Sequence, residues 1–223
     1  MAGKNRELWD SVNEAIDRRR TLTVKTVTYL PRERAHIDAI LGAFLEASGM
    51  QPLRNKLGYC VHELAGNAKK ANTKRLYFKD NGLKIDDPAD YARGMAGFKQ
   101  EMVDRVAHYE GRLKDEGLYV KFQFRAAERG VYVNVRNNVE LTDFEKIRID
   151  QKLAIAQRYA CLADAYAMTE DGAEGAGLGI VMMMFMLKNL GFGTDSFSMS
   201  SAHGETVATL TLSTPQSAAS VTA

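Results

Sequence analysis

Two pairs of strand-like segments constrain the fold of this 223-residue chain most. Residues 118–125 and 131–136 are rich in alternating apolar and polar side chains and are separated by a short polar tip. Residues 192–200 and 205–212 alternate in the same way around a His-Gly turn. Short turns between alternating segments predict hairpins, and a hairpin requires antiparallel pairing. These hairpins exclude a wholly parallel, doubly wound sheet.

Helices outnumber strands in the rest of the chain. We therefore predict an α+β fold, a two-layer sandwich in which helices cover one face of a mixed, mostly antiparallel sheet. Apolar periodicity predicts helices over 4–20, 32–47, 52–72, 144–168 and 178–190, strands over 22–30 and 73–78, and a long helical pattern within 79–117. The expected organisation is an N-terminal helix (1–21), one domain (22–213) with a helical insertion (79–117), and a disordered tail (214–223).

Composition and charge exclude several classes of protein. Thirty Lys and Arg against 28 Asp and Glu give a net charge of +2, and no basic run follows the sequence, which argues against a nucleic-acid partner. No segment approaches the roughly 18 apolar residues of a membrane span, and the charged N-terminus has no secretory h-region. Cys60 and Cys161 fit buried thiols. We expect a cytoplasmic protein without a membrane partner.

The helix predicted over 52–72 carries an unusual polar face. At about 100° per residue, Glu63, Asn67 and Lys70 lie within one narrow sector, while the apolar side chains lie on the opposite side. An ordinary solvated face would give the same spacing, but such a face more often uses good helix formers than Asn. Gly66 flanks this face, and His62 lies about 100° from it, so we interpret His62 as structural.

A glycine cluster precedes the helix predicted over 178–190. Gly175, Gly177 and Gly179 permit close backbone approach, and free amides at a helix start favour phosphate. The spacing does not fit a Rossmann turn, and no Lys-Ser or Lys-Thr follows as in a P-loop.

Taken together and in this order, the two motifs resemble those of one family. HELAGNAKKAN (62–72) resembles the asparagine box of the gyrase, heat-shock chaperone, histidine kinase and MutL (GHKL) ATPase superfamily, and EGAGLGI (174–180) resembles its second glycine box. VYVNVRNNVELTDFEKI (131–147) stands where the family has a strand, an aspartate-containing first box and a helix. The resemblance covers about residues 22–212 and implies the Bergerat ATP-binding fold. The elements before the asparagine box are similar to those of stand-alone anti-sigma-factor serine kinases.

The resemblance implies roles for individual residues. ATP and Mg²⁺ would be the cofactors, with Glu63 as the general base and Asn67 as the magnesium ligand. Lys70 would lie near the phosphates, and the second glycine box would wrap them. The nucleotide-binding positions carried over are Asn67, Lys70, Asn137, Gly175, Gly177, Leu178, Gly179 and Thr206.

The sequence departs from the family at the first box. Asn137 replaces the aspartate that accepts the adenine amino proton, and Val139 and Leu141 place side chains where the family keeps glycine. Two hypotheses follow. The chain is an ATP-dependent kinase or ATPase in bacterial signalling that acts on a protein partner, or it is a non-catalytic module whose fold binds a regulatory protein. The stripe Leu8, Val12 and Ile16 of the first helix either forms a homodimer or docks on the domain.

Overall fold

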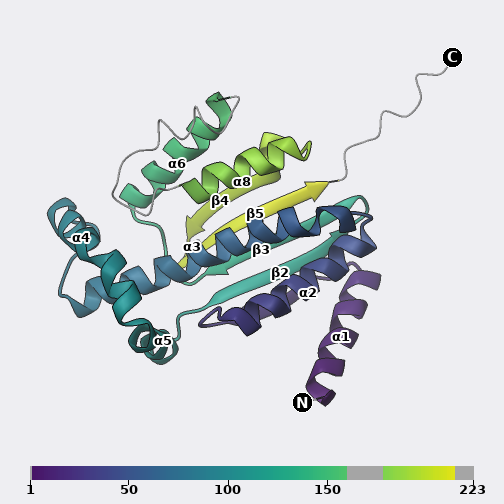
Figure 1. Cartoon of the computed structure of the whole chain (residues 1–223), viewed down its shortest axis with the longest axis horizontal. Helices are drawn as coiled ribbons and strands as arrows, with labels where there is room; N and C mark the ends of the chain where they lie inside the picture. Colours follow the sequence, from purple (N-terminus) through teal and green to yellow (C-terminus); the bar gives the residue numbers. More distant parts are fainter. Residues whose placement is uncertain (1, 160–177, 214–223) are drawn as a thin grey trace.

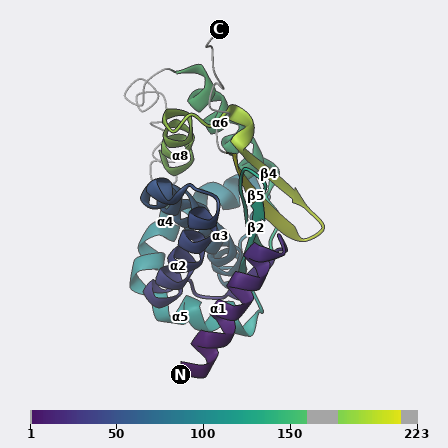
Figure 2. The ribbon, with the colours of Figure 1, turned by 90° about the vertical axis from the view of Figure 1, so that its right-hand side faces the viewer.

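A computed structural model describes residues 2–159 and 178–213, and its elements form two layers (Figure 1). One layer is a five-stranded sheet, and the other is a set of helices on one face of that sheet (Figure 2). The predicted α+β class is therefore confirmed. In chain order the elements are α1 (Ala2–Asp17), β1 (Leu22–Thr26), α2 (Pro31–Ala47), the 3-10 turn η1 (Gln51–Leu53), α3 (Arg54–Asp80), α4 (Pro88–Asp104), α5 (Val106–Asp115), β2 (Val120–Ala127), β3 (Gly130–Asn137), α6 (Asp143–Arg158), α8 (Leu178–Asn189), the 3-10 turn η2 (Thr194–Ser196), β4 (Phe197–Ala202) and β5 (Glu205–Ser213).

The sheet has the strand order β1-β2-β3-β5-β4. Both predicted hairpins are present, since β2 pairs with β3 and β4 pairs with β5. The two remaining pairings, β1 with β2 and β3 with β5, are also antiparallel. The prediction of a mixed sheet was therefore wrong for the described strands. Helical connections can join antiparallel strands as well as parallel ones, so the helices between β1 and β2 did not settle strand direction.

Alternation along the strands directs one side-chain row into the helical layer. Phe122 and Phe124 of β2 are fully buried, whereas Gln123 between them is only half-buried. Phe124 contacts Phe44 of α2, with ring centroids 5.7 Å apart. The same core takes residues from α3 and α8, including the buried thiol Cys60 and the methionine Met183. Burial of this apolar surface is the main favourable term in folding.

The N-terminal helix docks on the domain. Val12 is fully buried and Ala15 nearly so in the main core, and Leu8 and Ile16 pack against it. In the view of Figure 1, α1 lies at the lower right, below the right-hand end of α2. Its apolar stripe is therefore occupied within the chain.

The helix α3 continues through a segment for which we predicted a strand. Residues 73–78 are helical, and the prediction of a strand was wrong. Leu76, Tyr77 and Phe78 are buried against the insertion, so tertiary packing outweighs their β propensity. The Thr73 hydroxyl donates to the Lys69 carbonyl, 2.9 Å away, which satisfies it inside the helix.

The insertion forms two helices with a second, smaller core. A break at Arg105 separates α4 from α5, so that the apolar faces of both helices reach the end of α3. Phe98 of α4 and Tyr109 and Leu113 of α5 are buried there. The last turns of α3 contribute Leu76, Tyr77 and Phe78 to this core, so the smaller core includes the end of α3 as well as α4 and α5.

Other element boundaries shifted for local reasons. The strand β1 ends at Thr26 because Tyr29 has a positive φ of 51° and Glu33 binds the Thr28 hydroxyl and the Leu30 amide. The strand β4 begins only at Phe197, after η2. The predicted features at 160–177 and 214–223, which include Cys161 and the tail, lie outside the described residues.

Two glycines in the insertion predict opposite effects of the same substitution. A Cβ at Gly94 would lie 2.5 Å from the ring of Phe78, which is 2% exposed and cannot move away, so Gly94→Ala should destabilise by about 1–3 kcal/mol. Gly111 has open space around it, so Gly111→Ala should stabilise by about 1 kcal/mol through helix propensity. Urea unfolding of both variants tests the packing of α4 on α3. Equal changes in the two variants would contradict it.

Candidate functional site

A cavity of about 150 Å³ lies between α3, the ends of β3 and β5, α6 and α8. Six residues predicted from the sequence line it: Glu63, Asn67, Lys70, Asn137, Gly179 and Thr206. They come from four separate elements and span 144 positions from first to last. Leu178 is the first residue of α8 and is not among the lining residues, while Gly175 and Gly177 lie outside the described residues.

The α3 wall carries the polar face predicted from helical spacing. Glu63 and Asn67 are half-buried and Lys70 is exposed, whereas Leu64 and Ala65 on the other side are buried, as predicted. The Asn67 amide nitrogen Nδ2 donates to Glu63 Oε1, 3.0 Å away. This bond orients the Glu63 carboxylate and leaves the Asn67 carbonyl oxygen Oδ1 as the free acceptor of that side chain.

Gly179 packs directly on the Glu63 carboxylate. A Cβ at position 179 would lie 1.7 Å from Glu63 Oε1, a distance that no side chain can occupy. A glycine at this place in the first turn of α8 is therefore required for Glu63 to hold its position. The two sequence motifs, 116 residues apart, meet at this contact.

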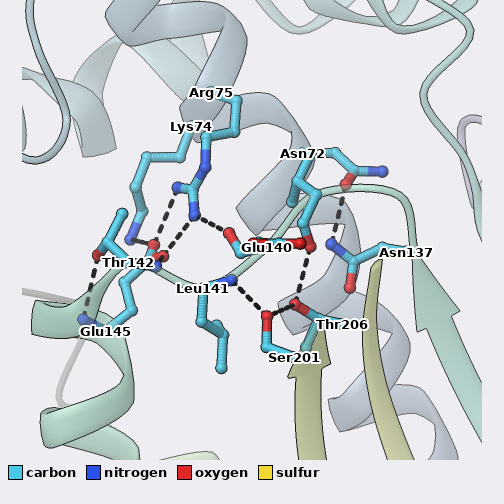
Figure 3. Close-up of polar contacts among 11 residues, drawn as sticks. Asn72, Lys74, Arg75, Asn137, Glu140, Leu141, Thr142, Glu145, Ser201 and Thr206 are labelled. Atoms are coloured by element: carbon cyan, nitrogen blue, oxygen red, sulfur yellow. Dashed lines mark hydrogen bonds and ion pairs between the residues drawn. The ribbon is translucent and has the colours of Figure 1, made fainter. Parts of the chain in front are cut away.

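The opposite wall is formed by Asn137 and Thr206, which are cross-strand partners at the ends of β3 and β5. Both are buried. The fully buried Asn72 of α3 donates its Nδ2 to the Tyr119 carbonyl, 2.9 Å away, so its oxygen is the atom left to bind Asn137. Asn137 Nδ2 donates to that oxygen at 3.0 Å (Figure 3). This chain of bonds fixes the orientation of the Asn137 amide and leaves its oxygen as an acceptor.

The hydroxyl of Thr206 is held by its own bonds. It donates to the Val139 carbonyl at 2.8 Å and lies 3.2 Å from the Ser201 hydroxyl. Ser201 in turn accepts from the Leu141 amide at 2.8 Å (Figure 3). These bonds fix the backbone after β3, and the Leu141 side chain lines the cavity beside Asn137.

Sequence reasoning missed a buried ion cluster at one end of the cavity. Glu145 of α6 accepts from Lys74 Nζ at 3.0 Å and from Arg75 Nη2 at 2.5 Å (Figure 3). Burial alone would raise the pKa of Glu145, but the hydrogen bond from Arg75 and the charges of Lys74 and Arg75 outweigh it and lower that pKa to about 2. The cluster ties α3 to the start of α6.

The same carboxylate caps α6. Glu145 Oε2 accepts from the Thr142 amide at 3.0 Å, and the Glu145 amide donates to the Thr142 hydroxyl at 3.2 Å, a reciprocal capping box. The Thr-x-x-Glu pattern is visible in the sequence and would have placed the helix start. Its ion partners are 70 and 71 residues earlier, and no local pattern indicates them.

Cations dominate the charged lining of the cavity. Lys70 and Lys74 from α3 and Arg148 and Lys152 from α6 line it, against the acidic Glu63 and Glu145. Within the described lining the cations outnumber the carboxylates by four to two, and this excess of positive charge suits an anionic ligand.

The interpretation of His62 as a structural residue agrees with its contacts. Its Nε2 lies 2.6 Å from Asp38 Oδ1, and its Nδ1 bonds the Tyr29 hydroxyl. Burial lowers the pKa of His62 more than Asp38 raises it. The two bonds use both ring nitrogens to join α3 to α2 and to the segment after β1.

Within the described ranges, no three His, Cys, Asp or Glu side chains gather as a metal site, and no helix is both long and apolar enough to cross a bilayer. A preformed carboxylate or imidazole cage is thus absent from the part of the chain that the structure describes.

Comparisons with known proteins found one informative relationship. The chain is 40% identical over 191 residues to an uncharacterized protein of Treponema pallidum (strain Nichols). The match covers 85% of this chain but only 37% of the length of that relative. No family model matches the chain, and no solved structure matches it. The functional argument therefore rests on the site itself.

The Glu145 cluster predicts an acid-sensitive contribution to stability. The folded pKa of about 2 lies below the unfolded value of roughly 4.3, so this contribution is complete above about pH 5 and is lost as the pH falls towards 2. Glu145→Gln should lower the free energy of unfolding at pH 7 by about 3 kcal/mol, since it removes the buried negative charge that binds Lys74 and Arg75.

Urea unfolding at pH 7 and pH 3 measures this contribution, with Glu46→Gln as the control on an exposed face of α2. The difference between wild type and Glu145→Gln should shrink at pH 3, and Glu46→Gln should resemble wild type at both values. A Glu145→Gln difference that is independent of pH would contradict the assignment.

Proposed function

We propose that this chain binds ATP with Mg²⁺ in the cavity between α3, α6 and α8, and transfers the terminal phosphoryl group to water or to a hydroxyl of a protein partner in bacterial signalling. It would be a histidine-kinase-like ATPase domain with the Bergerat fold. One observation carries the proposal: six positions selected from the sequence for nucleotide chemistry line a single cavity, although they come from four elements.

The part of the cavity lined by Asn137 suits an adenine base. The Asn137 oxygen is an acceptor held in place by Asn72, as recognition of an exocyclic amino group requires. Asn137 thus supplies the hydrogen-bonding role of the family's aspartate without its charge. Apolar side chains for the faces of a base line the cavity nearby: Val135, Leu141, Ile180 and Met199.

The part of the cavity lined by Asn67 and the cations suits phosphates and magnesium. Lys70 is exposed at the cavity and offers a cation, and Arg148 and Lys152 of α6 add two more. Mg²⁺ prefers oxygen ligands and usually takes only one or two from the protein, with phosphate oxygens and waters completing its shell. Asn67 Oδ1 would be such a ligand, because its own Nδ2 is bonded to Glu63.

Glu63 is placed to act as the general base. Asn67 donates to one of its carboxylate oxygens and Gly179 packs against it, so it has little rotational freedom. It would accept the proton of the attacking water or hydroxyl, while the bound nucleotide supplies an activated phosphoryl group. Phosphoryl transfer depends mainly on positioning and on neutralising charge, which the cations of α3 and α6 can provide.

The alternative is a non-catalytic module that binds a regulatory protein. Two observations favour it. The cavity of about 150 Å³, as bounded by described residues, is smaller than the roughly 300–1,000 Å³ of typical ligand pockets. The α4–α5 insertion has its own core and presents the exposed apolar side chains Val103 and Val106.

Calorimetric titration with a non-hydrolysable ATP analogue tests nucleotide binding. We expect binding that strengthens with Mg²⁺ and an Asn67→Ala variant that has lost the magnesium-dependent part, because the amide oxygen is gone. Asn55→Ala, which changes an exposed asparagine at the start of the same helix, should bind as wild type does. No binding at millimolar analogue would reject the proposal in favour of the protein-binding module.

A Glu63→Gln substitution separates catalysis from binding. Glutamine keeps the size of the side chain and can still accept from Asn67, but it cannot take a proton. Turnover of ATP should fall by about 10²- to 10⁴-fold with little change in the affinity for the analogue. A variant that retains wild-type turnover would remove Glu63 as the base.

A further inference from the structure

We propose that the face of the sheet turned away from the helices binds single-stranded nucleic acid. This outer sheet face is formed by the alternate residues of each strand that do not enter the core. No helix among the described elements covers it (Figure 2). It is separate from the proposed ATP cavity, whose lining includes Val135 and Ala208 from the opposite, core-facing side of the sheet.

A row of cations crosses three neighbouring strands of this face. Lys25 of β1 is the cross-strand partner of Lys121 of β2, and Lys121 is the partner of Arg136 of β3. Like charges directly opposite each other destabilise a sheet. This face has two adjacent pairs of like charge, Lys25 with Lys121 and Lys121 with Arg136. A negatively charged ligand would reduce the repulsion within both pairs.

Only part of that charge is neutralised by the residues that the structure describes. Glu205 of β5 bonds both Lys121 and Arg136, each at 3.1 Å. The Lys25 ammonium instead lies 4.1 Å from the centre of the Tyr119 ring. With Arg125 of β2 the outer face carries four cations against this one carboxylate.

The rest of the face offers groups that recognise bases. The next row holds Gln123 and Asn134, which are cross-strand partners with both donors and acceptors. One row further, Tyr132 of β3 stands beside Arg125, whose guanidinium lies 4.8 Å from the ring centre. Aromatic rings on the central strands of a sheet stack single-stranded bases while nearby cations follow the phosphates.

The charge pattern along the chain could not show this patch. The four cations come from three strands and are separated by up to 111 positions, so no basic run exists in the sequence. The expectation of no nucleic-acid partner rested on that missing run, and register is what brings the cations together. An acidic protein would need only the cations, whereas the tyrosine and the amide row favour nucleic acid.

Fluorescence anisotropy with a labelled 12-nucleotide single-stranded RNA of mixed sequence, and with the matching DNA, tests the proposal on the full chain. The double variant Lys25→Gln/Arg125→Gln removes two exposed cations that take no part in the Glu205 bonds. It should weaken binding at least tenfold and reduce the slope of log affinity against log salt by about 1.4. The control Lys56→Gln/Lys99→Gln removes two exposed cations from α3 and α4 and should change neither value by half as much.

Tyr132→Leu distinguishes a base-stacking face from a merely basic one. It keeps an apolar side chain on β3 and should weaken binding by roughly 5- to 150-fold with the salt slope unchanged. No binding to either oligonucleotide at 50 mM salt would overturn the proposal. So would equal binding of a 12-residue polyglutamate with no effect of Tyr132→Leu, which would identify an acidic polypeptide as the partner.

Discussion

The buried carboxylate of Glu145 holds together the parts of the molecule on which the site depends. An unpaired charge in this position would be strongly unfavourable, so α6, which Thr142 caps, can begin only where Lys74 and Arg75 of α3 meet Glu145. Arg75 also bonds the Glu140 carbonyl at 2.5 Å, which fixes the chain between β3 and α6. One cluster thus places the helix that lines the cavity and the segment that carries Leu141.

The long helix α3 connects the Glu145 cluster to the cavity and to the insertion. Its first half presents Glu63 and Asn67 to the cavity, its middle supplies Asn72 and the two cations, and its last turns form the floor of the insertion core. The insertion also touches α6, since the Tyr91 and Phe144 rings lie 5.9 Å apart. A partner bound to α4 or α5 would therefore contact helices that pack directly on α3 and α6, which line the site.

Local patterns predicted most of the fold because short turns and apolar periodicity decide it. Both hairpins, the helical face of Glu63 and Asn67, and the α+β class followed from spacing alone. The prediction of a strand over 73–78 was wrong because the apolar side chains of Tyr77 and Phe78 pack on the helices α4 and α5, and no local pattern shows that contact. The prediction of a mixed sheet was wrong because a helical connection can join either parallel or antiparallel strands.

The candidate site was predictable where motifs are local and unpredictable where contacts are distant. Asn72 lies five residues beyond Asn67, yet its role in orienting Asn137 depends on a pairing across 65 positions. The Glu145 cluster and the cationic row of the outer face also join residues that are far apart in the sequence. Sequence reasoning finds groups that one helix or turn presents together, and it misses groups that only register and packing join.

Net charge conceals how the charges are arranged in this molecule. Residues 79–117 carry nine acidic and seven basic side chains, while the outer sheet face has four cations against one carboxylate and the cavity lining has four more cations against two. The value of +2 therefore averages an acidic insertion and two basic surfaces together with the rest of the chain. Salt screens interactions between exposed charges that are farther apart than the Debye length, roughly 8 Å in physiological salt. A ligand at either basic surface therefore interacts with the nearby cations and is little affected by the net charge of the chain. An anionic ligand in the cavity and one on the sheet face would each be favoured by a charge distribution that the overall composition gives no reason to expect.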